Sequence, residues 1–244
     1  MNNKKTALIT GANKGIGLET ARQLGKKDIT VLVGARDMAK GKSAVEELRK
    51  EGIDAHPLEI DVSDPASIKK AAAKVESDFG RLDILINNAG VMNDDKKKKV
   101  SEQALEIWRS TFATNLFGVI ETTNAFLPLL RKSEAGRIVN LSSILGSTEF
   151  HATPGSPVYE SKDTPAYNVS KAAVNAYTVQ LAYELKDSKV KVNAAHPGWV
   201  KTDMGGEGAM MEIEDGAKTS VELATLGADG LNGTFVHMGK PLPW

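Results

Sequence analysis

The sequence predicts an α/β fold in which a doubly wound parallel sheet is covered by helices on both faces. Three observations support this prediction. Short apolar runs alternate with longer amphipathic stretches along the 244 residues. The apolar runs are rich in Val, Ile and Leu and do not alternate with polar residues, as expected of strands buried on both faces. A glycine-rich turn follows the first apolar run, and polar motifs follow later ones.

The N-terminal half contains four expected strands, at residues 7–9, 29–33, 58–60 and 83–86. Helical patterns follow them at about residues 15–25, 38–51 and 101–130, and a further helix opens at Ser63-Asp64-Pro65. Asp is a favoured capping residue and Pro is favoured in the first turn, so these residues mark a helix start. The order strand–helix–strand implies right-handed crossovers between parallel strands.

The C-terminal half adds strands at residues 137–141, 190–194 and 234–236, which completes a seven-stranded sheet, and a helix that begins near Pro165. Two segments interrupt the alternation, at about residues 144–164 and 201–215. Both follow a strand end, where such sheets bind ligands. Residues 151–165 contain three prolines and a glycine, which predicts a loop. No linker or repeat divides the chain, so we expect one catalytic domain over residues 1–244.

Composition excludes several classes of function. Acidic and basic residues balance at 31 each, which argues against nucleic acid or an anionic membrane as partner. The chain has no cysteine, and its four histidines lack metal-ligand spacing, so we expect neither disulfides nor a metal site. The N-terminus Met1–Lys5 leads directly into a short strand, without the apolar core of a signal peptide. No apolar run is long enough to span a membrane, and we expect a cytoplasmic protein.

The glycine-rich turn is the first candidate site, with the sequence Thr10-Gly11-Ala12-Asn13-Lys14-Gly15-Ile16-Gly17. In Rossmann-type folds, small residues here let the backbone approach a pyrophosphate, and the N–H groups of the helix start bind it. The spacing is Gly-x-x-x-Gly-x-Gly rather than the common Gly-x-Gly-x-x-Gly. A glycine-rich turn without a ligand is the alternative interpretation.

The end of the second strand indicates which nicotinamide cofactor is bound. An acid at this position would select NAD by binding the ribose hydroxyls, but the sequence has Ala35 followed by Arg36. A guanidinium suits a 2′-phosphate, and Lys14 adds a second positive charge. We therefore expect NADP(H). Asp37 lies too late in the sequence for the acid and is interpreted as a helix-start residue.

Further strand ends carry polar motifs. Asp61-Val62 follows the third strand and is placed to meet the adenine ring, and Asn87-Asn88-Ala89-Gly90 follows the fourth. Each motif is also a plausible turn former, and the sequence leaves that alternative open.

A catalytic group is predicted after the fifth strand. Tyr167 and Lys171 are spaced i, i+4 and share a helix face, so the ammonium is expected to lower the pKa of the phenol. Ser142 and Ser143 end the strand, and strand alternation places only one of them in the site, where its hydroxyl holds a substrate carbonyl. Asn115 either fixes a backbone kink and a proton-relaying water or is simply a polar helix residue.

These motifs, in this order over nearly the whole chain, resemble the classical short-chain dehydrogenases/reductases. The resemblance implies that Tyr167 is the general acid/base, that Lys171 binds the nicotinamide ribose and that Ser143 orients the carbonyl. It also assigns Asn115 to the catalytic set. Pro197, Gly198, Val200 and Thr202 then match the segment that contacts the nicotinamide carboxamide.

More narrowly, the glycine turn, Ala35-Arg36-Asp37 and the segment from Pro197 to Met204 resemble the NADPH-dependent carbonyl reductases. This resemblance implies that Asn13, Lys14 and Arg36 surround the 2′-phosphate and that hydride leaves the pro-S face. The interval from Ser143 to Tyr167 is longer than usual in the family, so the sequence does not decide between a monomer and a homo-oligomer.

The reaction expected is reduction of a ketone or aldehyde, a small-molecule substrate, with Tyr167 as acid. A hydroxysteroid dehydrogenase or a ketoacyl reductase on the same fold is an alternative. A non-catalytic NADP(H)-sensing regulator is an alternative of a different class, although such proteins typically lose part of the Ser/Tyr/Lys set. The segment 201–215, with Met204, Met210 and Met211, is interpreted as a mobile lid or a disordered loop.

Overall fold

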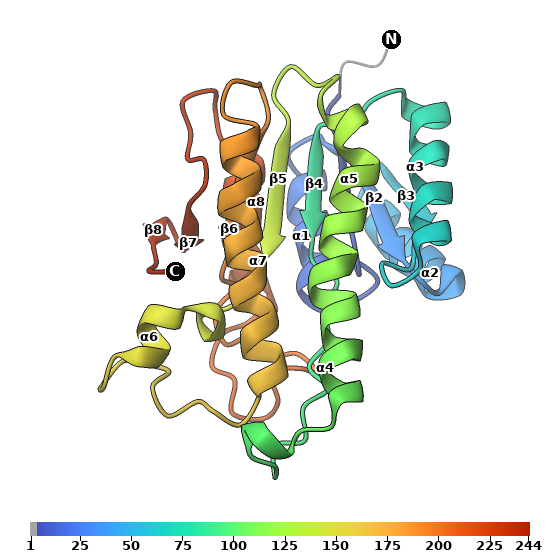
Figure 1. The fold of residues 1–244 in the computed structure, drawn as a ribbon. Helices are drawn as coiled ribbons and strands as arrows, with labels where there is room; N and C mark the ends of the chain where they lie inside the picture. The colour runs from blue at the N-terminus through green and yellow to red at the C-terminus, as the bar shows by residue number, and fades with distance from the viewer. Residues whose placement is uncertain (1–3) are drawn as a thin grey trace.

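Eight strands form one sheet at the centre of the molecule (Figure 1). The computed structural model describes residues 4–244, so Met1, Asn2 and Asn3, part of the stretch used to argue against a signal peptide, lie outside the described residues. The strand order is β3-β2-β1-β4-β5-β6-β7-β8, and only the β7–β8 pair is antiparallel. The strands are β1 (Thr6–Ile9), β2 (Thr30–Ala35), β3 (Ala55–Glu59), β4 (Ile84–Asn87), β5 (Arg137–Leu141), β6 (Lys191–Ala195), β7 (Phe235–His237) and β8 (Lys240–Pro241).

Helices cover both faces of the sheet, which confirms the doubly wound prediction (Figure 1). One apolar cluster joins α1, α2 and α8 to the sheet, and the other joins α3, α5 and α7 to its opposite face. The α-helices are α1 (Gly15–Gly25), α2 (Met38–Lys50), α3 (Pro65–Phe79), α4 (Leu105–Phe112), α5 (Gly118–Leu130), α6 (Thr148–Ala152), α7 (Pro165–Glu184) and α8 (Ile213–Ala224). Two 3₁₀ turns, η1 (Val100–Glu102) and η3 (Ile144–Gly146), and one π-helical turn, η2 (Ala113–Phe117), complete the set. None of these described helices is both long and apolar enough to cross a membrane.

The direction of winding reverses at β1. The chain proceeds from β1 outward to β3, then returns so that β4 pairs with the other edge of β1, with Leu8 opposite both Leu32 and Leu85. Connections after β1 and β4 therefore leave on opposite faces, and a crevice opens at the carboxyl ends of these strands. This reversal determines where the candidate site lies.

Aspartates begin two of the helices, as the sequence predicts. Asp64 caps α3 by accepting a hydrogen bond from the Ala66 N–H at 2.9 Å. Asp37 caps α2 and accepts from Ala39 and Lys40 at 2.9 and 3.2 Å, which confirms its interpretation as a helix-start residue. Its carboxylate is thereby committed to the backbone of α2.

The eighth strand and α8 were not predicted. Strand β8 has two residues and folds back on β7 through Met238 and Gly239, whose φ angles of 47° and 74° form a tight hairpin turn. A strand of this length carries no apolar pattern that a sequence could reveal. Helix α8 begins inside the segment 201–215 that was predicted to be irregular.

Two expected segments also differ in detail. The predicted helix over residues 101–130 is divided into η1, α4, η2 and α5. Extended backbone at Gln103 and Ala104 separates η1 from α4, and the π turn η2 separates α4 from α5. The irregular segment 144–164 contains η3 and the short helix α6, which overlaps only the first two residues of the loop predicted over 151–165. The backbone carbonyl of Trp244 accepts hydrogen bonds from Glu149 N at 3.1 Å and Ser147 Oγ at 3.2 Å, so the end of the chain holds α6 in place.

Candidate active site

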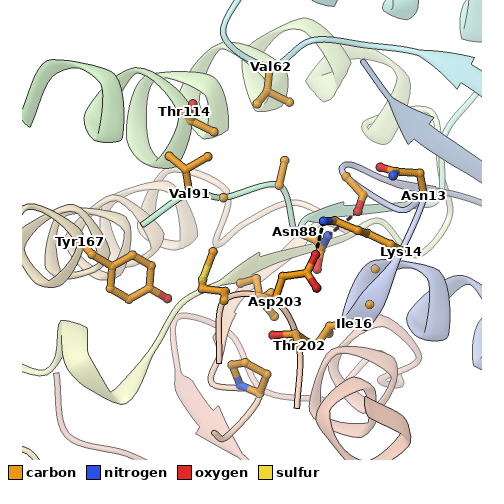
Figure 2. A pocket seen from close by; sticks show the side chains of 18 of the residues that line it. Asn13, Lys14, Ile16, Val62, Asn88, Val91, Thr114, Tyr167, Thr202 and Asp203 are labelled. Carbon is orange, nitrogen blue, oxygen red and sulfur yellow. Dashed lines mark hydrogen bonds and ion pairs between the residues drawn. The ribbon is translucent and has the colours of Figure 1, made fainter. Parts of the chain in front are cut away.

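A cavity of about 860 Å³ lies at the carboxyl ends of the strands. Tyr167 stands at one end and Asn13 and Lys14 at the other, with Asn88 between them (Figure 2). Most residues predicted to bind cofactor line this cavity: Gly11, Asn13, Lys14, Gly15, Ile16, Gly17, Arg36, Asp61, Val62, Asn88, Ala89, Gly90, Tyr167, Lys171, Pro197 and Thr202.

The glycine turn is shaped as a backbone cradle. Gly11 and Gly15 have φ angles of 64° and 57°, which disfavour any side chain. A Cβ added to Gly17 would lie 2.5 Å from the Asn88 amide nitrogen and 2.7 Å from the Gly11 carbonyl oxygen. Lys14, at the N-cap of α1, supplies no side-chain acceptor for the first-turn N–H groups. These donors are left for an anion, so the turn fits a dinucleotide pyrophosphate.

Asn88 braces this turn from β4. Its side-chain amide donates to the carbonyls of Thr10 and Gly11 at 2.8 and 3.2 Å. In return, the Thr10 hydroxyl oxygen accepts from the N–H groups of Asn88 and Ala89 at 3.1 and 3.0 Å. The Asn-Asn-Ala-Gly motif therefore holds the glycine turn in shape through the Asn88 amide nitrogen, and the predicted contact of Asn88 with the cofactor stays a prediction.

The end of the cavity near Lys14 carries opposed charges. The Lys14 ammonium forms an ion pair with Asp203, which joins the glycine turn to the segment after β6 (Figure 2). Arg36 is exposed after β2. Asp61 accepts from the N–H and hydroxyl of Ser63 at 2.9 and 2.6 Å, and these bonds, with the charge of Arg36, lower the pKa of its carboxyl.

At the other end, only one of the two serines serves the phenol. The Ser142 hydroxyl donates to Asn175 Oδ1 at 2.6 Å and is buried. The Ser143 hydroxyl lies beside the Tyr167 phenol, where it opposes the rise in the pKa of that group, and it accepts from the Leu145 N–H at 3.2 Å. This side chain is therefore placed to share a substrate oxygen with Tyr167, although Ser143 does not itself line the cavity.

The expected lowering of the Tyr167 pKa is wrong in direction. Burial raises the pKa of this phenol to about 12, and the nearby Ser143 hydroxyl offsets only part of the rise. The Lys171 ammonium lies 5.6 Å from the centre of the Tyr167 ring and donates to the Leu141 carbonyl at 2.7 Å, not to the phenol. Burial lowers the pKa of Lys171 to about 8. Desolvation therefore outweighs the attraction that the i, i+4 spacing suggested.

Asn115 lies in the π turn η2 and is fully buried. Its side-chain oxygen accepts from the Val91 N–H at 2.8 Å, and its amide donates to the Val91 carbonyl at 2.9 Å and to Ser170 Oγ at 3.0 Å. The predicted backbone irregularity is present. The side chain, however, binds protein groups on both sides, and the water-binding part of the prediction stays a prediction. Asn115 and Lys171 both adjoin Gly90, whose added Cβ would lie 3.4 and 3.6 Å from their polar atoms.

Gly198 and Val200 are not among the residues that border the cavity, and their predicted contact with the cofactor stays a prediction. Gly198 has a φ of 92°, and a Cβ there would lie 2.1 Å from Met211 Sδ, so the glycine allows the segment to fold on itself. Val200 is buried and bridges to Met211. These residues support Pro197 and Thr202, which do border the cavity.

His196 supports the same segment. Its Nδ1 accepts from the N–H groups of Ile144 and Gly198 at 3.2 and 3.4 Å, and burial followed by the nearby charge of His237 lowers its pKa to about 3. The ring is therefore neutral at neutral pH. Within residues 4–244, no cluster of three or more acidic or histidine side chains could hold a metal ion.

Several cavity residues were not predicted from the sequence. They come from strand ends, from η2 and from the segment after β6: Ile60, Ser63, Val91, Thr114, Leu141, Lys201, Asp203, Gly206, Glu207 and Ile213. Ser142, one of the two serine candidates, and Met204, from the lid segment, line the cavity as well. The irregular segment 201–215 signalled its own part of this set. The cavity residues outside this segment lie within a few residues of the predicted motifs, but only the folded chain shows which of them face the cavity.

Comparisons with known proteins agree with this geometry. A family model described as short chain dehydrogenase matches residues 5–212. The chain is 34% identical to short-chain dehydrogenase/reductase 1 of Saponaria officinalis, with 99% of this chain and 96% of the relative covered. It is 32% identical to carbonyl reductase [NADPH] 1 of Mus musculus, with 99% of each covered. An NADPH-bound carbonyl reductase structure from chicken fatty liver superposes with a TM-score of 0.85 at 27% identity, over 99% of each chain.

The matched residues include the glycine turn, the strand-end motifs and the Tyr167–Lys171 helix. This chain therefore belongs to the short-chain dehydrogenase family, oxidoreductases that act on carbonyl and alcohol groups.

Proposed function

We propose that the protein is an NADPH-dependent carbonyl reductase that converts a ketone or aldehyde into an alcohol. The observation that carries this proposal is a single cavity with two chemically distinct ends. One end has a glycine-rich turn with the cations Lys14 and Arg36, and the other has a buried phenol with a serine hydroxyl beside it. The similarity to carbonyl reductases that are named for NADPH supports it.

The residues that would hold NADP(H) follow from the shape of the cavity. The first-turn N–H groups of α1 would bind the pyrophosphate, and Lys14, Arg36 and Asn13 would surround the 2′-phosphate. Val62 and Asp61 border the part of the cavity where adenine would lie, and Pro197 and Thr202 border the part where the nicotinamide carboxamide would lie. When bound, the reduced cofactor supplies a hydride to the carbonyl carbon of the substrate.

Tyr167 then supplies the proton. Its phenol donates to the carbonyl oxygen as negative charge develops there, and the Ser143 hydroxyl donates a second hydrogen bond to the same oxygen. An alkoxide is far more basic than a phenolate, so the transfer is downhill even with the raised pKa of Tyr167. Lys171 would bind the nicotinamide ribose, and with Asn115 it borders the route by which the phenolate regains a proton.

The direct test is the loss of NADPH absorbance with a panel of aldehydes, aromatic ketones, α-dicarbonyls, steroids and acyl thioesters, repeated with NADH. We expect turnover of several simple carbonyls and a strong preference for NADPH. Turnover confined to steroids or acyl thioesters would reassign the substrate class. Tight NADPH binding with no turnover across the panel would contradict the reductase proposal and favour a nucleotide sensor.

A further inference from the structure

The first turn of α7, which carries Tyr167, has two backbone donors that its own sequence does not satisfy. Pro165 has no N–H, and the Asn168 N–H bonds to the Thr164 carbonyl at 2.9 Å. The Thr164 hydroxyl stands at the N-cap but donates to Asn168 Oδ1 at 3.0 Å, so it caps no N–H. The N–H groups of Ala166 and Tyr167 remain.

Asp94 satisfies both of these donors from the loop after β4. Its Oδ1 accepts from the Ala166 N–H at 2.7 Å and its Oδ2 from the Tyr167 N–H at 3.1 Å. The carboxylate is contributed from 73 residues away in the chain. Its negative charge also suits the positive end of a 20-residue helix.

Tyr167 is held on its other side as well. Its carbonyl accepts from Ser170 Oγ at 2.7 Å, and Ser170 Oγ accepts from Asn115 Nδ2 at 3.0 Å. Asn115 in turn binds both the N–H and the carbonyl of Val91. Because Val91 and Asp94 belong to one short loop, the contacts form a closed ring that fixes both backbone groups of Tyr167.

We propose that Asp94 is a positioning residue that closes this ring and so fixes the phenol of Tyr167 relative to Ser143. Asp94 does not line the cavity, and it acts through the backbone of α7. Val91, in the same loop, does line the cavity, so the ring joins the cofactor site to the proton donor. The inference rests on the proposed function, in which Tyr167 is the acid.

The first test compares Asp94→Ala with Asp94→Asn. We expect Asp94→Ala to lower kcat about tenfold to a hundredfold, since small misplacements of a reacting group have effects of this size. The Kd for NADPH, from fluorescence titration, should stay within about twofold, because the glycine turn is untouched. Asp94→Asn keeps one acceptor oxygen and should recover part of kcat. With deuterated NADPH, the isotope effect on kcat should rise in Asp94→Ala.

Asp95→Ala is the matched control. Asp95 is the adjacent residue, and its side chain accepts only from the Lys97 N–H at 3.1 Å, within its own loop. This variant should keep wild-type kcat. Wild-type kcat in Asp94→Ala, or an equal loss in Asp95→Ala, would overturn the proposal.

A second measurement does not depend on turnover. Hydrogen exchange of a peptide covering residues 165–170 should speed up in Asp94→Ala and stay unchanged in Asp95→Ala, because two amides lose their acceptor. Unchanged hydrogen exchange in Asp94→Ala would overturn the proposal that Asp94 holds the backbone of Tyr167. If the wild type binds NADPH but reduces no carbonyl, the proposed function fails. The exchange measurement still shows whether the Asp94 carboxylate protects the N–H groups of Ala166 and Tyr167.

Discussion

Burial acts on the two central ionisable residues in opposite directions. It raises the pKa of the Tyr167 phenol to about 12 and lowers that of the Lys171 ammonium to about 8, so it favours the neutral form of each. A neutral phenol is the state that can donate a proton. The local chemistry therefore suits carbonyl reduction at neutral pH better than alcohol oxidation, which needs the phenolate.

The pH dependence follows from these shifts. The ammonium of Lys171 is present below about pH 8 and is lost as the pH rises through that value, whereas the Tyr167 phenol stays protonated to about pH 12. We expect kcat/KM for reduction to be level up to about pH 8 and then to fall, and the rate of oxidation to rise with pH. Initial rates in both directions from pH 6 to 10 check this, and a reduction rate that rises across pH 8 would contradict it.

Removal of the Tyr167 hydroxyl tests the role of the phenol. Tyr167→Phe should lower kcat on the order of 10²- to 10⁴-fold, the usual contribution of a general acid, while NADPH still binds. Tyr177→Phe is the control, because Tyr177 lies on the same helix and its hydroxyl is also buried, but it does not line the cavity. Near-normal turnover by Tyr167→Phe would exclude it as the acid.

Arg36 tests the choice of cofactor. Arg36→Asp replaces the guanidinium that would face the 2′-phosphate with a carboxylate. The preference for NADPH over NADH should then fall by about tenfold or more, because charge-assisted hydrogen bonds contribute about 1.5–3 kcal/mol. Lys42→Asp makes the same charge change on the exposed face of α2, away from the cavity lining. The measurement is the ratio of kcat/KM with NADPH to kcat/KM with NADH. An equal change of this ratio in Arg36→Asp and Lys42→Asp would show that only the overall charge matters.

At the scale of elements, η3 packs against α7 through a glycine. A Cβ on Gly146 would lie 2.7 Å from the Lys171 carbonyl carbon and 2.9 Å from the Ala172 nitrogen, both backbone atoms. Gly146→Ala should therefore push η3 from α7, lower the free energy of unfolding by about 1–3 kcal/mol and reduce kcat by displacing Ser143. Gly227→Ala, where a Cβ meets nothing within 4 Å, should do neither. Urea unfolding and kcat of both variants provide the comparison.

Elements that carry a periodic pattern or a motif could be predicted, and those created by long-range contacts could not. Helix α7 and the glycine turn of α1 follow from local sequence. Helix α6 has five residues and depends on the distant Trp244 carbonyl. Likewise, Tyr167, Lys171 and Ser143 belong to recognisable motifs, whereas Asp94 and Asp203 reach the site only by tertiary proximity. The sign of the Tyr167 pKa shift was missed because sequence spacing does not report burial.

For the whole molecule, buried His196 makes stability sensitive to acid. Burial lowers its pKa to about 3, so below about pH 6.5 the unfolded chain binds a proton that the folded chain does not. Its neutral form is stabilising above pH 6.5, and that contribution is lost as the pH falls toward 3. We expect a loss of up to about 1.4 kcal/mol per pH unit in this window.

Urea unfolding at pH 7 and pH 5 measures this loss. His196→Asn removes the titrating group and should flatten the difference between the two pH values. His56→Asn, on the surface beside Asp54, should leave the wild-type difference in place. An unchanged pH dependence in His196→Asn would assign the acid sensitivity to other groups.

The ion pair between Lys14 and Asp203 has a kinetic consequence. It ties the glycine turn to the segment after β6, and both partners border the cavity. A dinucleotide whose phosphate engages Lys14 would compete with this carboxylate for the lysine. Both side chains are well exposed, so dissolved salt screens the attraction. We therefore expect the rates at which the nucleotide enters and leaves, and the residence time of the spent coenzyme, to vary with ionic strength.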